Sequence, residues 1–274
     1  MNFLGQVLPE KGLIFQVFEY GFILGFVLLA AWVSRVYMIR IDPRIQGQGA
    51  LRTKVLAACF FIFAAGYGWV VLTGERSNVL TCVLTLNLVL FASVLGSWLA
   101  VSLKRPAELV PVCVVVSLAD LFSVFAGPTR NFAENISGYY EGGMKGIPPL
   151  VDFFLLKMPL PGSDLFLPVF GVSDWVVIVF LCACAEKFKM NDSLVGKQGR
   201  LYFPIACLGL CLSIFSAWWG NLFLPALPFI SLGFAGVMAV RYPEMRKLTK
   251  AEIRPMLGFS ALLIGLIIMV RVFR

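Results

Sequence analysis

The sequence contains no histidine among its 274 residues. Histidine is the usual general base beside a catalytic serine or cysteine, and it provides two ligands of the HExxH zinc site. Its absence excludes these sites and every other imidazole metal site. Charged residues are also scarce at 14%, whereas hydrophobic residues make up 59% of the chain. Soluble domains have about 45–50% apolar and about 25% charged residues, so the composition indicates a membrane protein.

Cysteine is present, but in no pattern that points to chemistry. Cys182 and Cys184 have CxC spacing, yet no second cysteine pair lies in a loop to complete a metal site. We therefore expect no metal site, and expect the cysteines to act as small apolar side chains. All seven fall inside apolar stretches: Cys59, Cys82, Cys113, Cys182, Cys184, Cys207 and Cys211.

Long apolar stretches predict membrane-spanning helices. The expected fold is therefore all-α, a polytopic bundle of about eight transmembrane helices. Small-residue spacings at Gly21/Gly25 and Ala64/Gly68 predict close packing between these helices. The predicted spans are roughly 15–38, 53–74, 77–103, 107–126, 165–185, 201–219, 222–240 and 256–273.

The distribution of basic residues predicts the orientation. Sixteen of the 23 lysines and arginines lie in or beside the loops after the first, third, fifth and seventh spans. Because basic loops stay on the cytoplasmic side, both termini and the 127–164 loop are expected outside. We interpret the net charge of +8 in this way, and expect a lipid bilayer and no nucleic acid as partner.

Two aspartates interrupt consecutive apolar spans. Asp120 lies in 107–126 and Asp174 in 165–185. A carboxylate at the centre of a membrane helix costs about 2.5–3.5 kcal/mol on insertion scales, so it needs a partner or a task. At 1.5 Å per residue, the two aspartates are expected about 9 and 14 Å below the outer ends of their helices. They are therefore expected to face each other.

Two further segments accompany the aspartates. The 127–164 loop is long and contains the apolar run 150–156, which is too short to span a membrane; Asp152 and Asp164 in this loop are expected to be solvated charges. Pro225 and Pro228 predict that residues 224–234 are not helical. Non-helical backbone at membrane depth needs a wet cavity or protein cover, so this segment is expected beside the aspartates.

The residues alone leave three functions open for the aspartate pair. Two carboxylates in one site titrate as a unit, and together they can activate water and protonate a leaving amine without metal or cofactor. The same pair could bind a proton or cation in a transporter. It could also be a structural pair that locks two helices together.

Three motifs in order resemble the presenilin and signal peptide peptidase family of intramembrane aspartyl proteases. Residues 119–134, ADLFSVFAGPTRNFAE, resemble the family's YD helix, and 171–174, GVSD, resemble its GxGD motif. Residues 224–228, LPALP, contain its PAL motif, and 205–214 resemble the preceding helix. The resemblance covers about residues 107–240.

The resemblance implies that Asp120 and Asp174 form a catalytic dyad that cuts transmembrane helices or signal peptides within the bilayer. It implies that five residues position the substrate: Pro225, Ala226 and Leu227 of the PAL motif, and Gly171 and Ser173 beside the second aspartate. The chain departs from the family in two motifs. Ala119 stands where the family has Tyr, and Ser173 stands where it has its second Gly.

The resemblance also implies a division of the chain. A three-helix membrane region over 1–106 precedes a presenilin-like catalytic core over 107–240, and an extra helix follows over 241–274. Three spans precede the first aspartate helix, where the family usually has five. The outside loop between the aspartates matches signal peptide peptidases, so substrates are expected to enter with a cytoplasmic N-terminus. The lack of a recognised sorting signal favours a prokaryotic plasma membrane, and a catalytically silent, helix-binding relative is the remaining alternative.

Overall fold

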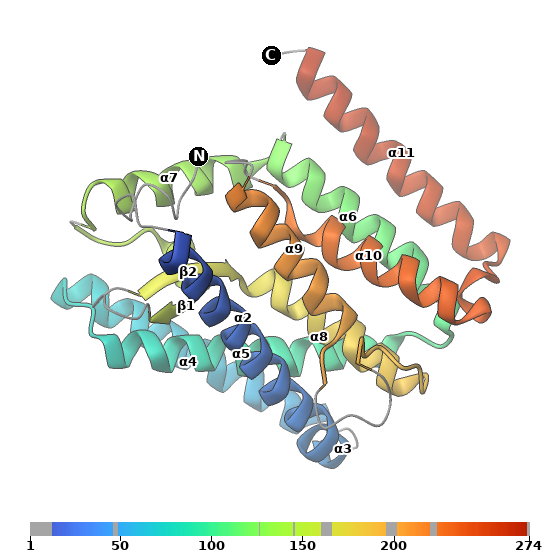
Figure 1. The fold of residues 1–274 in the computed structure, drawn as a ribbon, viewed down its shortest axis with the longest axis horizontal. Helices are drawn as coiled ribbons and strands as arrows, with labels where there is room; N and C mark the ends of the chain where they lie inside the picture. The colour runs from blue at the N-terminus through green and yellow to red at the C-terminus, as the bar shows by residue number, and fades with distance from the viewer. Residues whose placement is uncertain are drawn as a thin grey trace. The chain divides into compact units, whose positions relative to one another are not determined.

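The computed structural model describes residues 13–45, 49–125, 127–144, 146–159, 166–195, 202–219 and 224–272. These residues are mostly helical, as the sequence predicts, with one two-stranded antiparallel sheet among them (Figure 1). In chain order the helices and strands are α2 (Leu13–Val36), α3 (Asp42–Ile45), α4 (Gly49–Thr73), α5 (Asn78–Ser102), α6 (Leu109–Phe125), α7 (Pro128–Glu141), β1 (Leu155–Pro159), β2 (Phe166–Gly171), α8 (Val172–Lys187), α9 (Ile205–Trp219), α10 (Ala226–Arg241) and α11 (Lys250–Val272). Short π- and 3-10 segments are η1 (Tyr37–Ile41), η2 (Pro106–Glu108), η3 (Leu150–Phe154) and η4 (Pro243–Arg246).

Among the described residues, four helical segments are long and apolar enough to cross a membrane, which indicates a multi-pass membrane protein. Their outer faces carry large apolar side chains, among them Phe61 at 69% and Leu72 at 88% exposure. Such faces are unfavourable in water and suited to lipid. The segments correspond to the first four predicted spans: Val17–Arg44, Gly49–Thr73, Asn78–Ser102 and Pro106–Phe125. Two shorter apolar helices are Ile205–Ala217 and Ala226–Arg241.

The chain divides into two compact units. The first contains Leu99–Glu134 and Leu181–Arg274, and the second contains Phe3–Trp98 and Asn135–Phe180. Each unit thus joins segments far apart in sequence. The division into 1–106, 107–240 and 241–274 stays a prediction.

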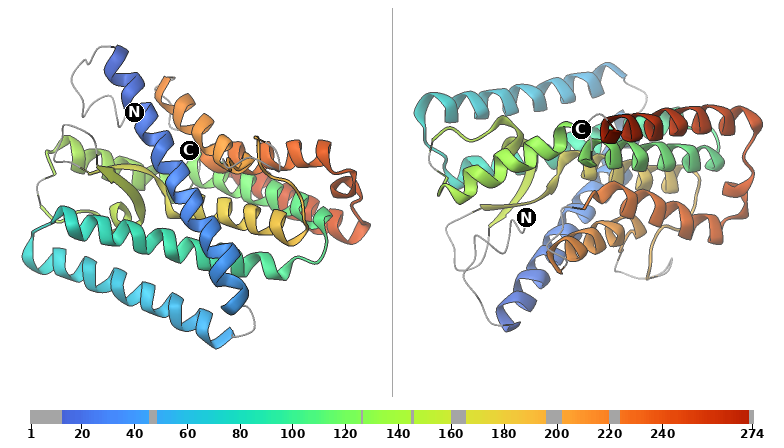
Figure 2. Two further views of the ribbon diagram at one scale, coloured as in Figure 1. Left: turned by 60° about the horizontal axis from the view of Figure 1, so that its bottom comes forward. Right: turned by 90° about the horizontal axis from the view of Figure 1, so that it is seen from above.

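In the first unit, α6 packs against both α10 and α11, and α10 also packs against α9. Figure 2 shows α11 running beside α6. The contact between α9 and α10 is close at Gly209, where an added Cβ would lie 2.5 Å from the Phe229 carbonyl oxygen. Glycine lets the two backbones approach to a distance that no other residue permits.

In the second unit, polar contacts join the long helices. The Asn87 side chain on α5 donates to the Cys59 carbonyl on α4 at 2.9 Å. Gly96 on α5 meets α8, since a Cβ there would lie 2.7 Å from the Val176 carbonyl oxygen. The prediction that helices pack closely at the Gly21/Gly25 and Ala64/Gly68 spacings is wrong for the glycines. Nothing lies within 4 Å of a Cβ at Gly21, Gly25 or Gly68.

The predicted membrane helix 165–185 is wrong in its first third. Residues Phe166–Gly171 form strand β2, and α8 begins only at Val172. Pro168 lacks the N–H that a helix interior needs, and the segment instead pairs with β1. Asp174 is therefore the third residue of α8, and the depth of 14 Å calculated for a continuous helix does not apply.

The predicted loop 127–164 contains ordered structure. Helix α7 occupies its first part, and η3 and β1 occupy its last part. The expectation that Asp152 is solvated is wrong, because its side chain is fully buried between Arg76 and Lys157. Asp164 lies outside the described residues.

The prediction of a non-helical segment 224–234 is also wrong beyond its first two residues. Only Leu224 and Pro225 precede the helix, and α10 begins at Ala226. Pro228 falls in the first turn of α10, where a helix needs no N–H from that residue. Two prolines three residues apart thus mark a helix start.

Candidate active site

Asp120 lies on the buried face of α6. Together with Asp120, the buried residues of α6 recur every three to four positions, which is the period of one helix face. These buried residues are Leu109, Cys113, Ser117 and Val124. Asp120 itself is partly buried. The carboxylate therefore points the same way as the packed side of the helix.

The partner of Asp120 comes from the start of α10. The Leu227 N–H donates a hydrogen bond to Asp120 Oδ2 at 3.0 Å. The first N–H groups of a helix have no acceptor within it. Pro225 precedes α10 in an extended conformation and makes no side-chain cap. Asp120 thus supplies from another helix the acceptor that a capping residue would normally give.

The position of Leu227 depends on the contact between α9 and α10. Gly209 faces Phe229 and Ile230, and both are within the first two turns of α10. The backbone contact at Gly209 therefore fixes the end of α10 that carries the PAL motif. Pro225 is buried, whereas Ala226 and Leu227 are partly exposed.

Asp174 lies in the first turn of α8. Its Oδ2 accepts a hydrogen bond from the Gly171 N–H at 3.1 Å, which is the reach-back contact of a capping box. A Cβ at Gly171 would lie 3.4 Å from Asp174 Oδ2 and 3.3 Å from Ser173 Oγ. Ser173 is exposed. Gly171 therefore lies directly against the Asp174 carboxylate, where a larger residue would crowd it.

The residue after Asp174 anchors the start of α8. Trp175 is fully buried and its indole N–H donates to Ser34 Oγ on α2 at 3.1 Å. Its ring lies 5.4 Å from that of Phe170 on β2. Strand, turn and helix start therefore form one rigid support for Asp174.

The structure thus brings together two groups of predicted site residues. Asp120 meets the PAL residue Leu227 in the first unit, and Asp174 meets Gly171 and Ser173 in the second. The pairing of Asp120 with Asp174 stays a prediction. All seven cysteines are free thiols, and within the described residues no three His, Cys, Asp or Glu side chains are grouped to hold a metal.

One polar cluster was missed by the sequence analysis. In the second unit, the Asp152 carboxylate accepts hydrogen bonds from Arg76, Lys157 and Tyr140. The available signal was the run LVDFFLLKM, in which a carboxylate and an ammonium group interrupt an apolar stretch at 150–158. Charges in such a run are expected to be paired when the run is buried.

Comparison of the chain with protein-family models, with curated proteins and with solved structures finds no match.

Proposed function

We propose that this chain is an intramembrane aspartyl protease of the presenilin and signal peptide peptidase type. The observation that carries the proposal is the hydrogen bond from the Leu227 N–H to the Asp120 carboxylate. It joins the first aspartate motif to the PAL motif, 107 residues further along the chain. A chance likeness of short motifs would not require them to meet, whereas the proposed active site does.

The proposed chemistry uses Asp120 and Asp174 as a pair. Two carboxylates in one site share a proton, so one is charged while the other is neutral. The charged carboxylate takes a proton from water, and the water oxygen bonds to the peptide carbonyl carbon. The neutral carboxylate gives its proton to the peptide nitrogen as the C–N bond breaks. The pair ends with one proton, as it began.

The proposal includes the arrangement of the helices in the membrane. Eight spans form the bundle, α6, α8 and α10 form its catalytic core, and both termini lie outside. Substrates are single-span helices or signal peptides whose N-terminus is cytoplasmic. The close approach of Gly171 to the Asp174 carboxylate and the exposed side chain of Ser173 support a role of these two residues in positioning the substrate next to Asp174.

The test is cleavage of a panel of single-span reporter helices in liposomes. Asp120→Asn and Asp174→Asn each remove an ionisable group but keep an oxygen that can accept the N–H bond of Leu227 or Gly171. Each is expected to lower the cleavage rate about 10²–10⁴-fold, the usual contribution of a general acid or base. Glu75→Gln, an exposed carboxylate in the α4–α5 connection, is the matched control and should cleave at the wild-type rate.

Cleavage that survives in both aspartate variants would exclude the proposed dyad. If no reporter is cut, binding of a transition-state-mimicking aspartyl protease inhibitor is measured next. Binding that depends on both aspartates supports a formed site and a missing substrate. Flux driven by a pH gradient, without cleavage or inhibitor binding, supports a transporter.

A further inference from the structure

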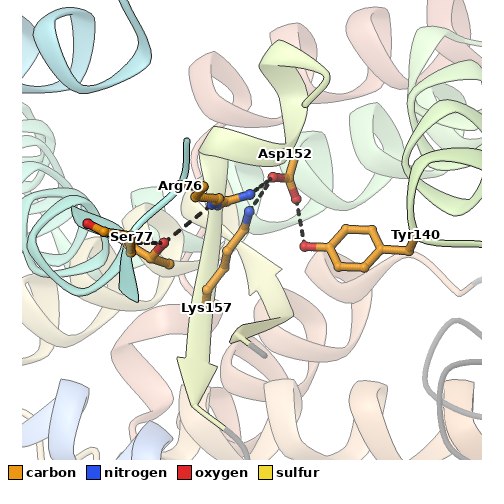
Figure 3. A network of polar contacts seen from close by, with 6 residues as sticks. Arg76, Ser77, Tyr140, Asp152 and Lys157 are labelled. Atoms are coloured by element: carbon orange, nitrogen blue, oxygen red, sulfur yellow. Dashed lines mark hydrogen bonds and ion pairs between the residues drawn. The ribbon is translucent and has the colours of Figure 1, made fainter. Parts of the chain in front are cut away.

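The second unit contains a buried ionic cluster outside the proposed dyad (Figure 3). Asp152 is fully buried, and its Oδ2 accepts hydrogen bonds from Arg76 at 2.6 Å and from the Lys157 ammonium group. Its other oxygen accepts a hydrogen bond from the Tyr140 hydroxyl at 3.0 Å. The four side chains come from the α4–α5 connection, α7, η3 and β1. One carboxylate therefore ties together three separate stretches of the chain: the α4–α5 connection, α7, and the continuous η3–β1 segment.

The surroundings of the cluster are aromatic. The ring of Phe153 lies 5.1 Å from the Arg76 guanidinium carbon and 5.8 Å from the Lys157 nitrogen. Tyr67 on α4 packs edge-on against the same ring at 5.0 Å. The Lys157 side chain is only 2% exposed. In such surroundings, removal of one member of the Asp152–Lys157 pair leaves the other as a buried charge without a partner. The loss is costly, so the pair stabilises the arrangement of the segments that carry it.

The cluster connects to Asp174 through the hairpin. Lys157 lies in β1, opposite Pro168 of β2, and Leu155 lies opposite Gly171 at the end of the hairpin. The Gly171 N–H in turn donates to Asp174. Each step is a direct contact within the second unit.

The hairpin needs an anchor of this kind. Its strands are five and six residues long, and the pairing is irregular between Leu156 and Lys157. Pro168 has no N–H to give to the ladder. A two-stranded hairpin is marginal in isolation, so contacts outside the ladder must fix its position.

We infer that Asp152 is a positioning residue for Asp174: it holds β1 against the α4–α5 connection and α7, and the hairpin then presents the Gly171 N–H to the Asp174 carboxylate. The inference rests on the proposed function for its catalytic consequence. Its structural content does not depend on cleavage, because the Gly171 amide reports directly on the bond to Asp174.

The test compares hydrogen exchange and cleavage in the full-length protein in nanodiscs. In Asp152→Asn, the amides of β1, β2 and Gly171 are expected to lose about a hundredfold in protection, since removal of one partner of a buried ion pair is costly. The amides of α6 and α10 should keep theirs. Tyr140→Phe removes a single hydroxyl and should lower the same protection about tenfold. Reporter cleavage in Asp152→Asn should lose at least about tenfold in kcat, because Asp174 is displaced.

The matched control is Asp192→Asn. Asp192 is a buried carboxylate in the first unit whose Oδ2 accepts a hydrogen bond from Tyr202. Asp192→Asn should leave the hydrogen-exchange protection of β1, β2 and Gly171 at the wild-type level. The comparison therefore distinguishes a local effect of Asp152 on the hairpin from general destabilisation of the protein.

Unchanged protection of Gly171 in Asp152→Asn would overturn the inference, whether or not the protein cleaves a reporter. Loosening of the hairpin with unchanged kcat would overturn it as well, because the cluster would then be structural only. If the wild type cuts no reporter, inhibitor binding tests the proposed function separately, and the Gly171 amide still decides whether Asp152 positions Asp174.

Discussion

At the scale of single residues, Asp120 and Asp174 each pair with a backbone N–H at the start of a helix. Asp120 takes the N–H of Leu227 in α10, and Asp174 takes that of Gly171 just before α8. A buried N–H without an acceptor costs about 1–3 kcal/mol. The proposed catalytic groups therefore also stabilise the fold, which is why isosteric asparagine variants are the appropriate test of chemistry.

Lys157 is the residue whose titration should be visible near neutral pH. Burial lowers the pKa of Lys157 to about 7, even though Asp152 acts to raise it. Burial alone would raise the pKa of Asp152, but Lys157 and Arg76 outweigh burial and hold it below its usual range. Asp152 therefore stays charged throughout the neutral range, and Arg76 balances it when Lys157 is neutral.

This predicts a stability that rises with pH above neutrality. The unfolded chain holds the Lys157 proton up to its ordinary pKa of 10.5, whereas the folded chain releases it near pH 7. Between these values the unfolded state binds more protons, so the free energy of unfolding increases by up to about 1.4 kcal/mol per pH unit. Because the chain has no histidine, no imidazole contributes in this range, and the comparison with a Lys157 variant isolates the contribution of Lys157.

The measurement is thermal unfolding in detergent from pH 6 to pH 9. The wild type should gain stability above pH 7, and Lys157→Met should follow a flatter curve over the same range. Lys54→Met, which removes an exposed lysine on α4, should run parallel to the wild type. Parallel curves for Lys157→Met and wild type would contradict the prediction.

The sequence predicted the neighbour of Asp120 correctly but the surroundings of Asp152 wrongly. The PAL segment was expected beside Asp120 because residues 224–234 were predicted to be non-helical at membrane depth; Leu227 does contact Asp120, although α10 already begins at Ala226. Asp152 was expected in water because its loop is long, and its partner Arg76 lies 76 residues earlier. A local pattern carries no information about a partner at that distance.

At the scale of helices and strands, glycines decide how closely the elements approach. Gly209 faces only backbone atoms of α10, with an added Cβ 2.5 Å from the Phe229 oxygen and 2.7 Å from the Ile230 Cα. Backbone cannot rotate away as a side chain can, so α9 and α10 would have to separate. That movement would also displace Leu227 from Asp120.

We therefore expect Gly209→Ala to destabilise the protein by about 1–3 kcal/mol, the usual cost of overpacking. It should also lower reporter cleavage more than stability alone explains. Gly233→Ala on α10 is the matched control, because nothing lies within 4 Å of its added Cβ. Melting temperatures and cleavage rates of the two variants, measured together, check the prediction. Equal behaviour of the two variants would contradict it.

Hydropathy predicted the long helices but not the hairpin. A run of 18 or more apolar residues can satisfy its backbone only as a helix, so α4 and α5 follow directly from composition. The run 165–185 is just as apolar, but Pro168 and pairing with residues 155–159 redirect its first third into a strand. The glycines at close contacts were missed for a related reason. Spacing shows which helix faces are small, but not which face meets a neighbour.

At the scale of the whole molecule, contacts within each unit are compatible with the predicted alternation of loops across the membrane, whereas the orientation itself stays a prediction. In the second unit, the ion pair of Arg76 with Asp152 joins the connections after the second and fourth spans, both expected outside. In the first unit, Arg105 pairs with Glu252 from the connections after the third and seventh spans, both expected in the cytoplasm. Lys187, after the fifth span, bonds the Leu103 carbonyl at the end of the third. No contact of this kind could form between loops on opposite sides of a membrane.

These contacts fix which loops share a side, and labelling can establish which side that is. We expect cysteine introduced at Gly142, in the exposed turn after α7, to react with a membrane-impermeant maleimide added to intact cells. Cysteine introduced at Arg44, exposed in α3, should react only after the membrane is permeabilised. The background is a chain in which Cys82, the exposed native thiol, is changed to serine. Reaction of Arg44→Cys but not Gly142→Cys in intact cells would reverse the orientation. Substrates would then be expected to enter with the N-terminus outside, and the reporter panel would have to be inverted to match.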